Sequence, residues 1–141
     1  MTTRAQMSES AKHEATHTEL MVAALEGRTV RLNVLLKSRV DVNERDNEGR
    51  TALMFAVTNM HRDSAKVLLE HGADVNLKAN NGCTALMLAA SSGESDLARA
   101  LLSKGADVTA KFTESGKTAL DLAKEKGHTE IVELLQAAED K

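Results

Sequence analysis

The chain has 141 residues, 42% of them hydrophobic, and a formal net charge of −3, which suits one domain with a packed core. The acidic balance and the lack of Trp and Tyr argue against a nucleic-acid binder, which needs a basic face or aromatic stacking platforms. The apolar runs are far shorter than the roughly 20 residues of a membrane span, and the N-terminal residues include no apolar signal segment. A single cysteine excludes an internal disulfide and suits a reducing compartment. We therefore expect a monomeric cytoplasmic protein with no nucleic-acid partner and no membrane insertion.

Residues 1–14 form a polar segment that we expect to be a tail or a short helix. Overlapping its end, His13-Glu14-Ala15-Thr16-His17 matches the H-E-x-x-H pattern of zinc peptidases, in which two histidines on one helix face hold Zn²⁺ and the glutamate acts as a base. A peptidase also needs a third fixed ligand and a cleft, and the sequence places neither beside this string. We therefore predict no metal, no cofactor and no catalytic residue, and keep a minimal zinc metallopeptidase as an alternative.

An internal repeat organises the rest of the chain. Residues 46–78 align with residues 79–111 without a gap, and both segments contain Thr-Ala-Leu-Met, Leu-Leu and Gly-Ala-Asp-Val at equal positions. A weaker copy of the pattern lies before residue 46, and another copy lies after residue 111. The last copy contains one extra residue in a turn, where insertions cost little. The resulting period of 33 residues is typical of proteins built from stacked units, because one unit cannot bury its own apolar face. We therefore expect one domain over residues 15–141, in four units of approximately 15–45, 46–78, 79–111 and 112–141.

The apolar spacing within each unit predicts two helices. In the second unit, one i, i+3, i+4 stripe starts at Leu53 and another starts at Ala65. Gly72 and Gly105 follow the second helix, where a left-handed residue is favoured. A threonine precedes each first helix and can cap it, at Thr18, Thr51, Thr84 and Thr118. Methionines at the repeat spacing are expected to pack between units, at Met21, Met54 and Met87.

The repeated strings Gly-x-Thr-Ala-Leu-Met, Leu-Leu and Gly-Ala-Asp-Val-Asn closely resemble the ankyrin repeat over about residues 15–138. The resemblance implies an all-α solenoid of four stacked helix-turn-helix units with β-turn finger loops. It also implies that Asn43 and Asn76 order the finger turns through hydrogen bonds from side chain to backbone. Whether either asparagine is hydroxylated, as in some members of the family, the sequence leaves open. Met60 stands where the other three units have glycine, so we expect a strained left-handed residue there, or at Asn59.

The resemblance further implies that a partner protein binds a concave strip formed by the finger tips and the exposed side of the first helices. We expect Arg45, Arg50 and Lys78 to form its centre and to meet an acidic or mixed partner surface. Phe112 is expected as the only aromatic anchor, or alternatively as a core residue of the last unit. Cys83 is expected at the surface, with no His or Arg beside it in the sequence to activate the thiol. Carried over position by position, the candidate partner-binding residues are Arg45, Asn47, Glu48, Arg50, Thr58, Asn59, Lys78, Asn80, Asn81, Cys83, Ser91, Ser92, Lys111, Phe112 and Lys117.

These observations favour a non-catalytic module that binds another protein, whose identity the sequence does not reveal. A narrower alternative is an ankyrin-type inhibitor of a kinase or another enzyme, since small four-repeat proteins of the family include cyclin-dependent kinase inhibitors. Those inhibitors commonly have a shortened first helix in the second unit, whereas the segment from Thr51 to Asn59 looks full length.

Overall fold

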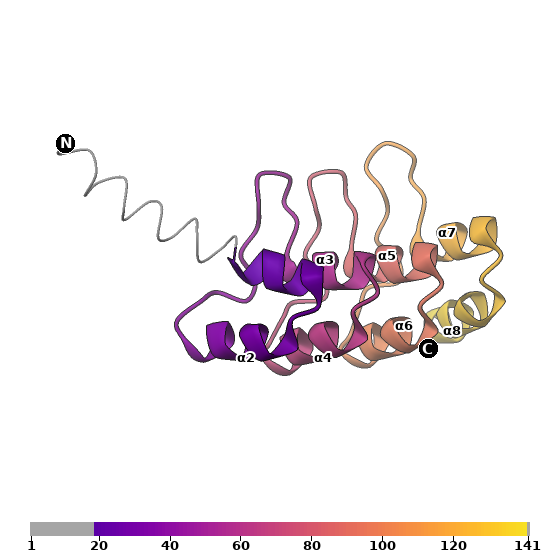
Figure 1. Cartoon of the computed structure of the whole chain (residues 1–141). Coiled ribbons are helices and arrows are strands. Elements are labelled where there is room, and N and C mark those ends of the chain that lie inside the picture. The colour runs from indigo at the N-terminus through magenta and orange to yellow at the C-terminus, as the bar shows by residue number, and fades with distance from the viewer. Residues whose placement is uncertain (1–18, 141) are drawn as a thin grey trace.

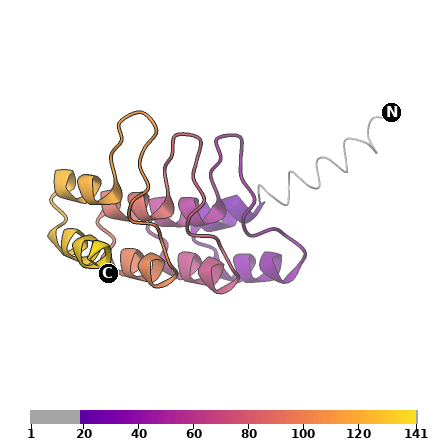
Figure 2. The ribbon, with the colours of Figure 1, turned by 180° about the vertical axis from the view of Figure 1, so that it is seen from behind.

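The computed structural model describes residues 19–140, and every regular element in that range is an α-helix. Residues 19–26 are helical, and they are followed by α2 (Thr29–Lys37), α3 (Ala52–Thr58), α4 (Arg62–Glu70), α5 (Ala85–Ser92), α6 (Ser95–Ser103), α7 (Ala119–Lys126) and α8 (Thr129–Glu139). The first helices of successive units form one layer and the second helices form the other, while the finger loops extend beyond the first layer (Figures 1 and 2). The predicted all-α solenoid of stacked helix pairs is confirmed.

Threonine caps define where the first helices begin. The Met54 N–H donates to Thr51 Oγ1 at 3.3 Å, and the third unit repeats this bond from Met87 to Thr84. The fourth unit has a complete capping box, because the Asp121 carboxylate also accepts from the Thr118 N–H at 3.0 Å. The caps predicted at these three threonines are confirmed, whereas Thr18 lies outside the described residues.

The corner between the two helices of a unit requires a left-handed residue. Gly27, Gly93 and Gly127 have φ values of 72°, 79° and 73°, and Met60 has a φ of 60° at the same place. Met60 is the only non-glycine residue with positive φ among residues 19–140. Asn59 does not relieve it, since its own φ is −95°. Because the Met60 side chain is 53% exposed, little packing compensates for this strain.

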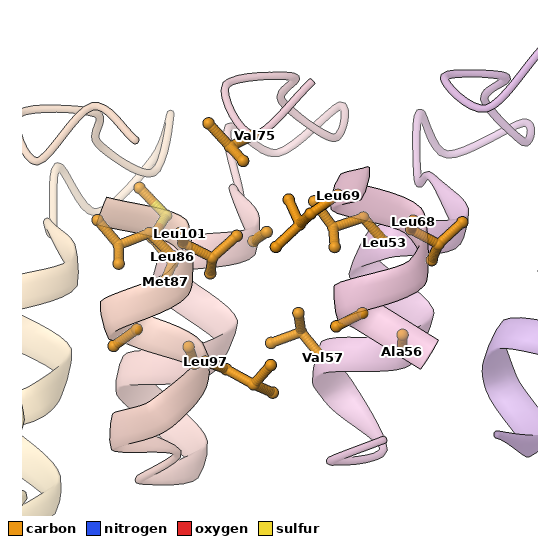
Figure 3. Close-up of a cluster of buried hydrophobic side chains, with 14 of the residues drawn as sticks. Leu53, Ala56, Val57, Leu68, Leu69, Val75, Leu86, Met87, Leu97 and Leu101 are labelled. Carbon is orange, nitrogen blue, oxygen red and sulfur yellow. The ribbon is translucent and has the colours of Figure 1, made fainter. Parts of the chain in front are cut away.

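The core is a continuous layer of aliphatic side chains between the two helix layers. Leu53 and Val57 of the second unit join Leu86 and Leu97 of the third in one cluster (Figure 3). The three methionines at the repeat spacing are all buried, as predicted, with exposed fractions of 8%, 3% and 1% for Met21, Met54 and Met87. Stacking between units therefore buries the apolar stripes that no single unit could cover.

One polar side chain interrupts this core. Ser64 of α4 is 1% exposed, and its hydroxyl has no hydrogen-bond partner in the described part of the chain. The corresponding residues of the third and fourth units are Leu97 and Ile131, both fully buried. A buried hydroxyl without a partner has lost its hydrogen bonds to water without replacement, which costs stability.

Ion pairs at the surface join the second helices across three units, and of their side chains Glu94 alone is mostly covered. The Arg62 guanidinium contacts Glu94 and Asp96 of the next unit, each at 3.0 Å. Asp96 also pairs with Arg99 at 3.3 Å, and Arg99 reaches Glu130 of the fourth unit. We refer to these five residues as the ion-pair ladder. It lies along the starts of α4, α6 and α8, where acidic residues also favour the helix dipole.

Candidate functional site

The fingers are tight hairpins that hydrogen-bond to one another through their backbones. The second-unit finger closes through the Asp46 N–H and the Arg50 carbonyl at 2.9 Å, and the next finger closes in the same way from Ala79 to Cys83 at 2.8 Å. The Asn80 N–H donates across to the Glu48 carbonyl at 2.9 Å. Adjacent fingers are therefore fixed in register, and their side chains are held in place before any partner arrives.

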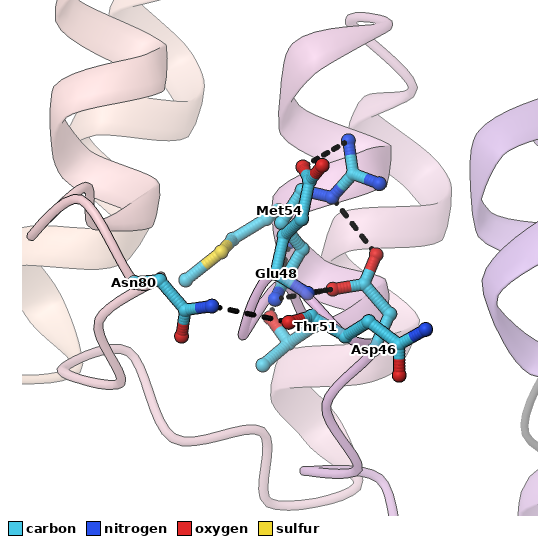
Figure 4. Close-up of polar contacts among 7 residues, drawn as sticks. Asp46, Glu48, Thr51, Met54 and Asn80 are labelled. Atoms are coloured by element: carbon cyan, nitrogen blue, oxygen red, sulfur yellow. Dashed lines mark hydrogen bonds and ion pairs between the residues drawn. The ribbon is translucent and has the colours of Figure 1, made fainter.

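The tip of the second-unit finger is organised by one carboxylate. Asp46 accepts the N–H groups of Glu48 and Arg50 at 2.9 and 2.8 Å, and it also accepts the Arg50 Nε at 2.8 Å (Figure 4). Partial burial acts to raise the pKa of Asp46, but these hydrogen bonds outweigh it and hold the pKa below its ordinary value. The Arg50 guanidinium also lies 3.4 Å from a Glu48 oxygen and 4.9 Å above the Phe55 ring. Arg50 is thus engaged by two carboxylates and an aromatic face within the chain itself.

The third-unit finger reaches the same shape by another route. Ala79 replaces the aspartate, and Asn81 Oδ1 instead accepts the Cys83 N–H at 3.1 Å. Asn80 Nδ2 donates to the Asn47 carbonyl of the neighbouring finger at 3.1 Å. In this finger, the side-chain amides of Asn80 and Asn81 make the hydrogen bonds at the tip, where the second-unit finger uses the carboxylate of Asp46. The tip of the third-unit finger is therefore neutral.

A groove of about 650 Å³ lies between the fingers and first helices of the second and third units. Its apolar lining consists of Leu25, Met54, Phe55, Ala79, Cys83 and Leu88, and its polar lining of Glu48, Arg50, Thr58, Asn59, Asn80 and Asn81. Seven of the residues predicted from the sequence line it: Glu48, Arg50, Thr58, Asn59, Asn80, Asn81 and Cys83. A concave, mainly apolar groove with a few fixed polar groups is the usual form of a binding site.

The apolar floor was missed by the sequence analysis. Leu25, Phe55 and Leu88 come from three successive units, and the assignment of variable positions to the strip omitted them. The expectation that Phe112 is the only aromatic candidate was therefore wrong, because Phe55 also lines the groove. The available signal for Phe55 and Leu88 was the position one residue after each repeat methionine, which is apolar at Val22, Phe55 and Leu88, with Leu122 at the same position in the fourth unit. Leu25 is not at this position, because it aligns with Thr58 and Ser91, and the repeat pattern carries no signal for it.

Cys83 was expected at the surface and is instead buried, with 8% of its area exposed. It occupies the position of Arg50 in the previous unit, but its short side chain turns inward, and its Sγ lies 3.6 Å from the Thr84 carbonyl. Burial raises the pKa of the Cys83 thiol to about 11. The thiol therefore belongs to the floor of the groove and is not a reactive surface group.

The remaining candidates lie outside this groove. Arg45, Asn47, Lys78, Lys111 and Lys117 are exposed, and Ser91 and Ser92 are half-buried. Phe112 is half-buried, packs against the core, and lines a smaller groove with Asn80 and Asn81. Of the three cations predicted as the centre of the strip, only Arg50 lines the main groove.

The candidate zinc string lies elsewhere in the chain. His13, Glu14 and His17 are outside the described residues, so the structure contains no geometry for them. Within residues 19–140, no group of three His, Cys, Asp or Glu side chains is arranged to hold a metal ion. None of the helices in that range has the length and apolar character needed to cross a bilayer.

Comparison with known families identifies the chain. A family model described as ankyrin repeats, in three copies, matches residues 5–79 and 77–141. The chain therefore belongs to the ankyrin-repeat family, as its repeated motifs indicated. No curated protein matches the sequence. Ankyrin repeats are generally protein–protein interaction modules, which is the class of protein that this fold defines.

Proposed function

We propose that this protein is a non-catalytic binding module that receives its partner protein on the concave surface of the second and third units. The observation behind this proposal is the groove between the fingers and the first helices, which combines an apolar floor with fixed polar groups. Backbone bonds between neighbouring fingers hold this surface in place before binding. Because little must be ordered on association, most of the contact energy remains available for affinity.

The cations of the fingers have a secondary role in this proposal. Arg45 and Lys78 are exposed and outside the groove, where they steer an approaching partner and mainly affect the association rate. Lys78 already has the carboxylate of Asp107 in its surroundings. The pKa of Asp107 is lowered mainly by hydrogen bonds from Thr109 and to a smaller extent by the positive charge of Lys78. In this proposal, the apolar floor of the groove therefore contributes most of the binding energy, and the exposed cations mainly increase the rate of association.

Site-specific photo-crosslinking tests the proposed surface. A benzophenone amino acid replaces Thr58, an exposed residue lining the groove, and in a matched protein it replaces Lys66, an exposed residue of α4 in the other helix layer. After irradiation in lysate of the source cells, we expect protein adducts from position 58 and none above background from position 66. Adducts that form only from position 66 would show that the opposite face binds the partner.

A further inference from the structure

Two of the three asparagines that line the groove, Asn81 and Asn59, have hydrogen bonds that show which of their amide atoms are left over. Asn81 Oδ1 accepts a hydrogen bond from the Cys83 N–H. Because a backbone N–H can only donate, this bond identifies which side-chain atom is the oxygen, and the Nδ2 of Asn81 is the group that remains. Asn59 uses Nδ2 to donate to the Phe55 carbonyl at 3.0 Å, which leaves its Oδ1. Within the described residues neither leftover atom has a hydrogen-bond partner, and both residues line the groove.

The residues that carry these two atoms come from different elements around the groove. Asn81 belongs to the finger of the third unit. Asn59 directly follows the last residue of α3, the helix that begins just after the finger of the second unit. The seven residues of α3, which lines the groove, span about 10 Å at 1.5 Å per residue, a length equal to about three residues of extended chain at 3.3 Å each. A leftover donor from the finger and a leftover acceptor from the end of α3 match the C=O and N–H groups of a short extended peptide.

The charge of the groove argues against an acidic occupant. Its charged lining residues are Glu48 and Arg50, which pair with each other, and Arg50 is also bound by Asp46. The one guanidinium that lines the groove is therefore already paired with two carboxylates, and an incoming carboxylate would meet Glu48 with no unpaired cation among the described lining residues, beside an apolar floor. An uncharged segment avoids both the repulsion and the cost of desolvating a charge.

Resting on the proposed function, we propose that the groove binds a short extended segment of the partner protein that lacks acidic residues. A main-chain carbonyl of this segment accepts from Asn81 Nδ2, and a main-chain N–H donates to Asn59 Oδ1. Between them, an apolar side chain packs on Leu25, Phe55 and Leu88. The main-chain bonds provide orientation, and the floor provides the preference for an apolar residue.

Two pairs of variants test this assignment in the full-length protein. Asn81→Asp keeps an oxygen for the Cys83 N–H and replaces only the leftover donor, and Asn47→Asp places the same charge on the adjacent finger outside the groove lining. Leu25→Asp places a charge on the floor at a residue that is 40% exposed. Its control is Val30→Asp, at a residue of α2 that is 78% exposed and outside the groove lining.

The probe is a phage library of random 12-residue peptides, selected on the immobilised chain, with the enriched peptides then measured by calorimetry. We expect enriched peptides to share an apolar residue and to be depleted in Asp and Glu. Their affinity should fall at least tenfold in Asn81→Asp and Leu25→Asp, and should change less than twofold in Asn47→Asp and Val30→Asp. Acidic enriched peptides, no enrichment at all, or full affinity in Asn81→Asp would each overturn the proposal.

Crosslinking separates this result from the proposed function. If a partner still crosslinks from position 58 while peptide binding ignores Asn81→Asp, the binding surface is correct and the assigned ligand chemistry is wrong. If crosslinks arise only from position 66, both proposals fail.

Discussion

Asn76 Oδ1 accepts a 2.7 Å hydrogen bond from the backbone N–H of Asp107, which lies 31 residues later in the next unit. Asn76 Nδ2 also donates to the Gly105 carbonyl at 3.1 Å. One unit earlier, Asn43 Oδ1 accepts the Asp74 N–H, again at 2.7 Å. The expected bonds from side chain to backbone are therefore present, but they run to the turn after the second helix of the next unit and not within a finger turn, so they clamp one unit onto the next.

Asn76→Ala should destabilise the protein more than Asn43→Ala. Asn76 makes two bonds to the following unit, whereas one such bond is seen for Asn43, and each net hydrogen bond contributes about 0.5–1.5 kcal/mol. We expect a loss of about 2 kcal/mol for Asn76→Ala and about 1 kcal/mol for Asn43→Ala, measured by urea unfolding. Equal losses would mean that the bond to Gly105 adds no stability.

Met60→Gly should stabilise the protein by about 1 kcal/mol. Glycine removes the cost of a left-handed residue with a Cβ, about 1–2 kcal/mol, and loses part of this gain through a more flexible unfolded chain. Met60→Ala serves as the control, because it keeps the Cβ and removes only the side chain. A lower urea midpoint for Met60→Gly at unchanged slope would show that the methionine makes contacts worth more than its strain.

Ser64→Ala should raise stability by about 1 kcal/mol. The change removes a buried hydroxyl that has no partner within residues 19–140, and alanine is also the better helix former. Ser91→Ala, in α5 at a half-buried position, controls for the gain in helix propensity alone. If both changes have the same effect on the free energy of unfolding, the buried hydroxyl costs nothing.

Asp96→Asn should destabilise the protein by about 0.5–1 kcal/mol more than Asp63→Asn at low salt. Both aspartates lie in the first turn of a second helix, but Asp96 also bridges Arg62 and Arg99 in the ion-pair ladder. The side chains of Asp96 and its two arginines are each more than half exposed, so the difference should shrink toward zero at about 1 M salt. A difference that persists at high salt would point to packing and not to charge.

Stability should fall as the pH drops through the acidic range. Hydrogen bonds lower the pKa of Asp107 and Asp121, and at Asp46 they outweigh the opposing effect of burial. A carboxyl with a lowered folded pKa stabilises the fold above its unfolded value of about 3.9, and this stabilisation disappears as the pH falls through the folded value. We expect the urea midpoint to fall below about pH 5, and to fall less steeply in Asp46→Asn. An identical slope in that variant would exclude Asp46 from the effect.

Much of the architecture was predictable because it depends on residues close together in the chain. A threonine three residues before the amide that it caps, as at Thr51 and Thr84, is a local signal. The left-handed corner at Met60 followed from aligning it with glycines one unit away. The repeat predicted that the units stack, because similar units can bury their apolar stripes only against each other.

The tertiary structure decided how the same slot is used in successive units. Arg50 and Cys83 occupy equivalent positions, yet Arg50 extends to Asp46 and Glu48 while Cys83 turns into the core. The floor of the groove likewise combines Leu25, Phe55 and Leu88 from three successive units, so no single unit contains it. Sequence periodicity shows which residues are equivalent, but the direction of a side chain and its charge partners depend on the neighbouring finger and helix, which only stacking brings within reach.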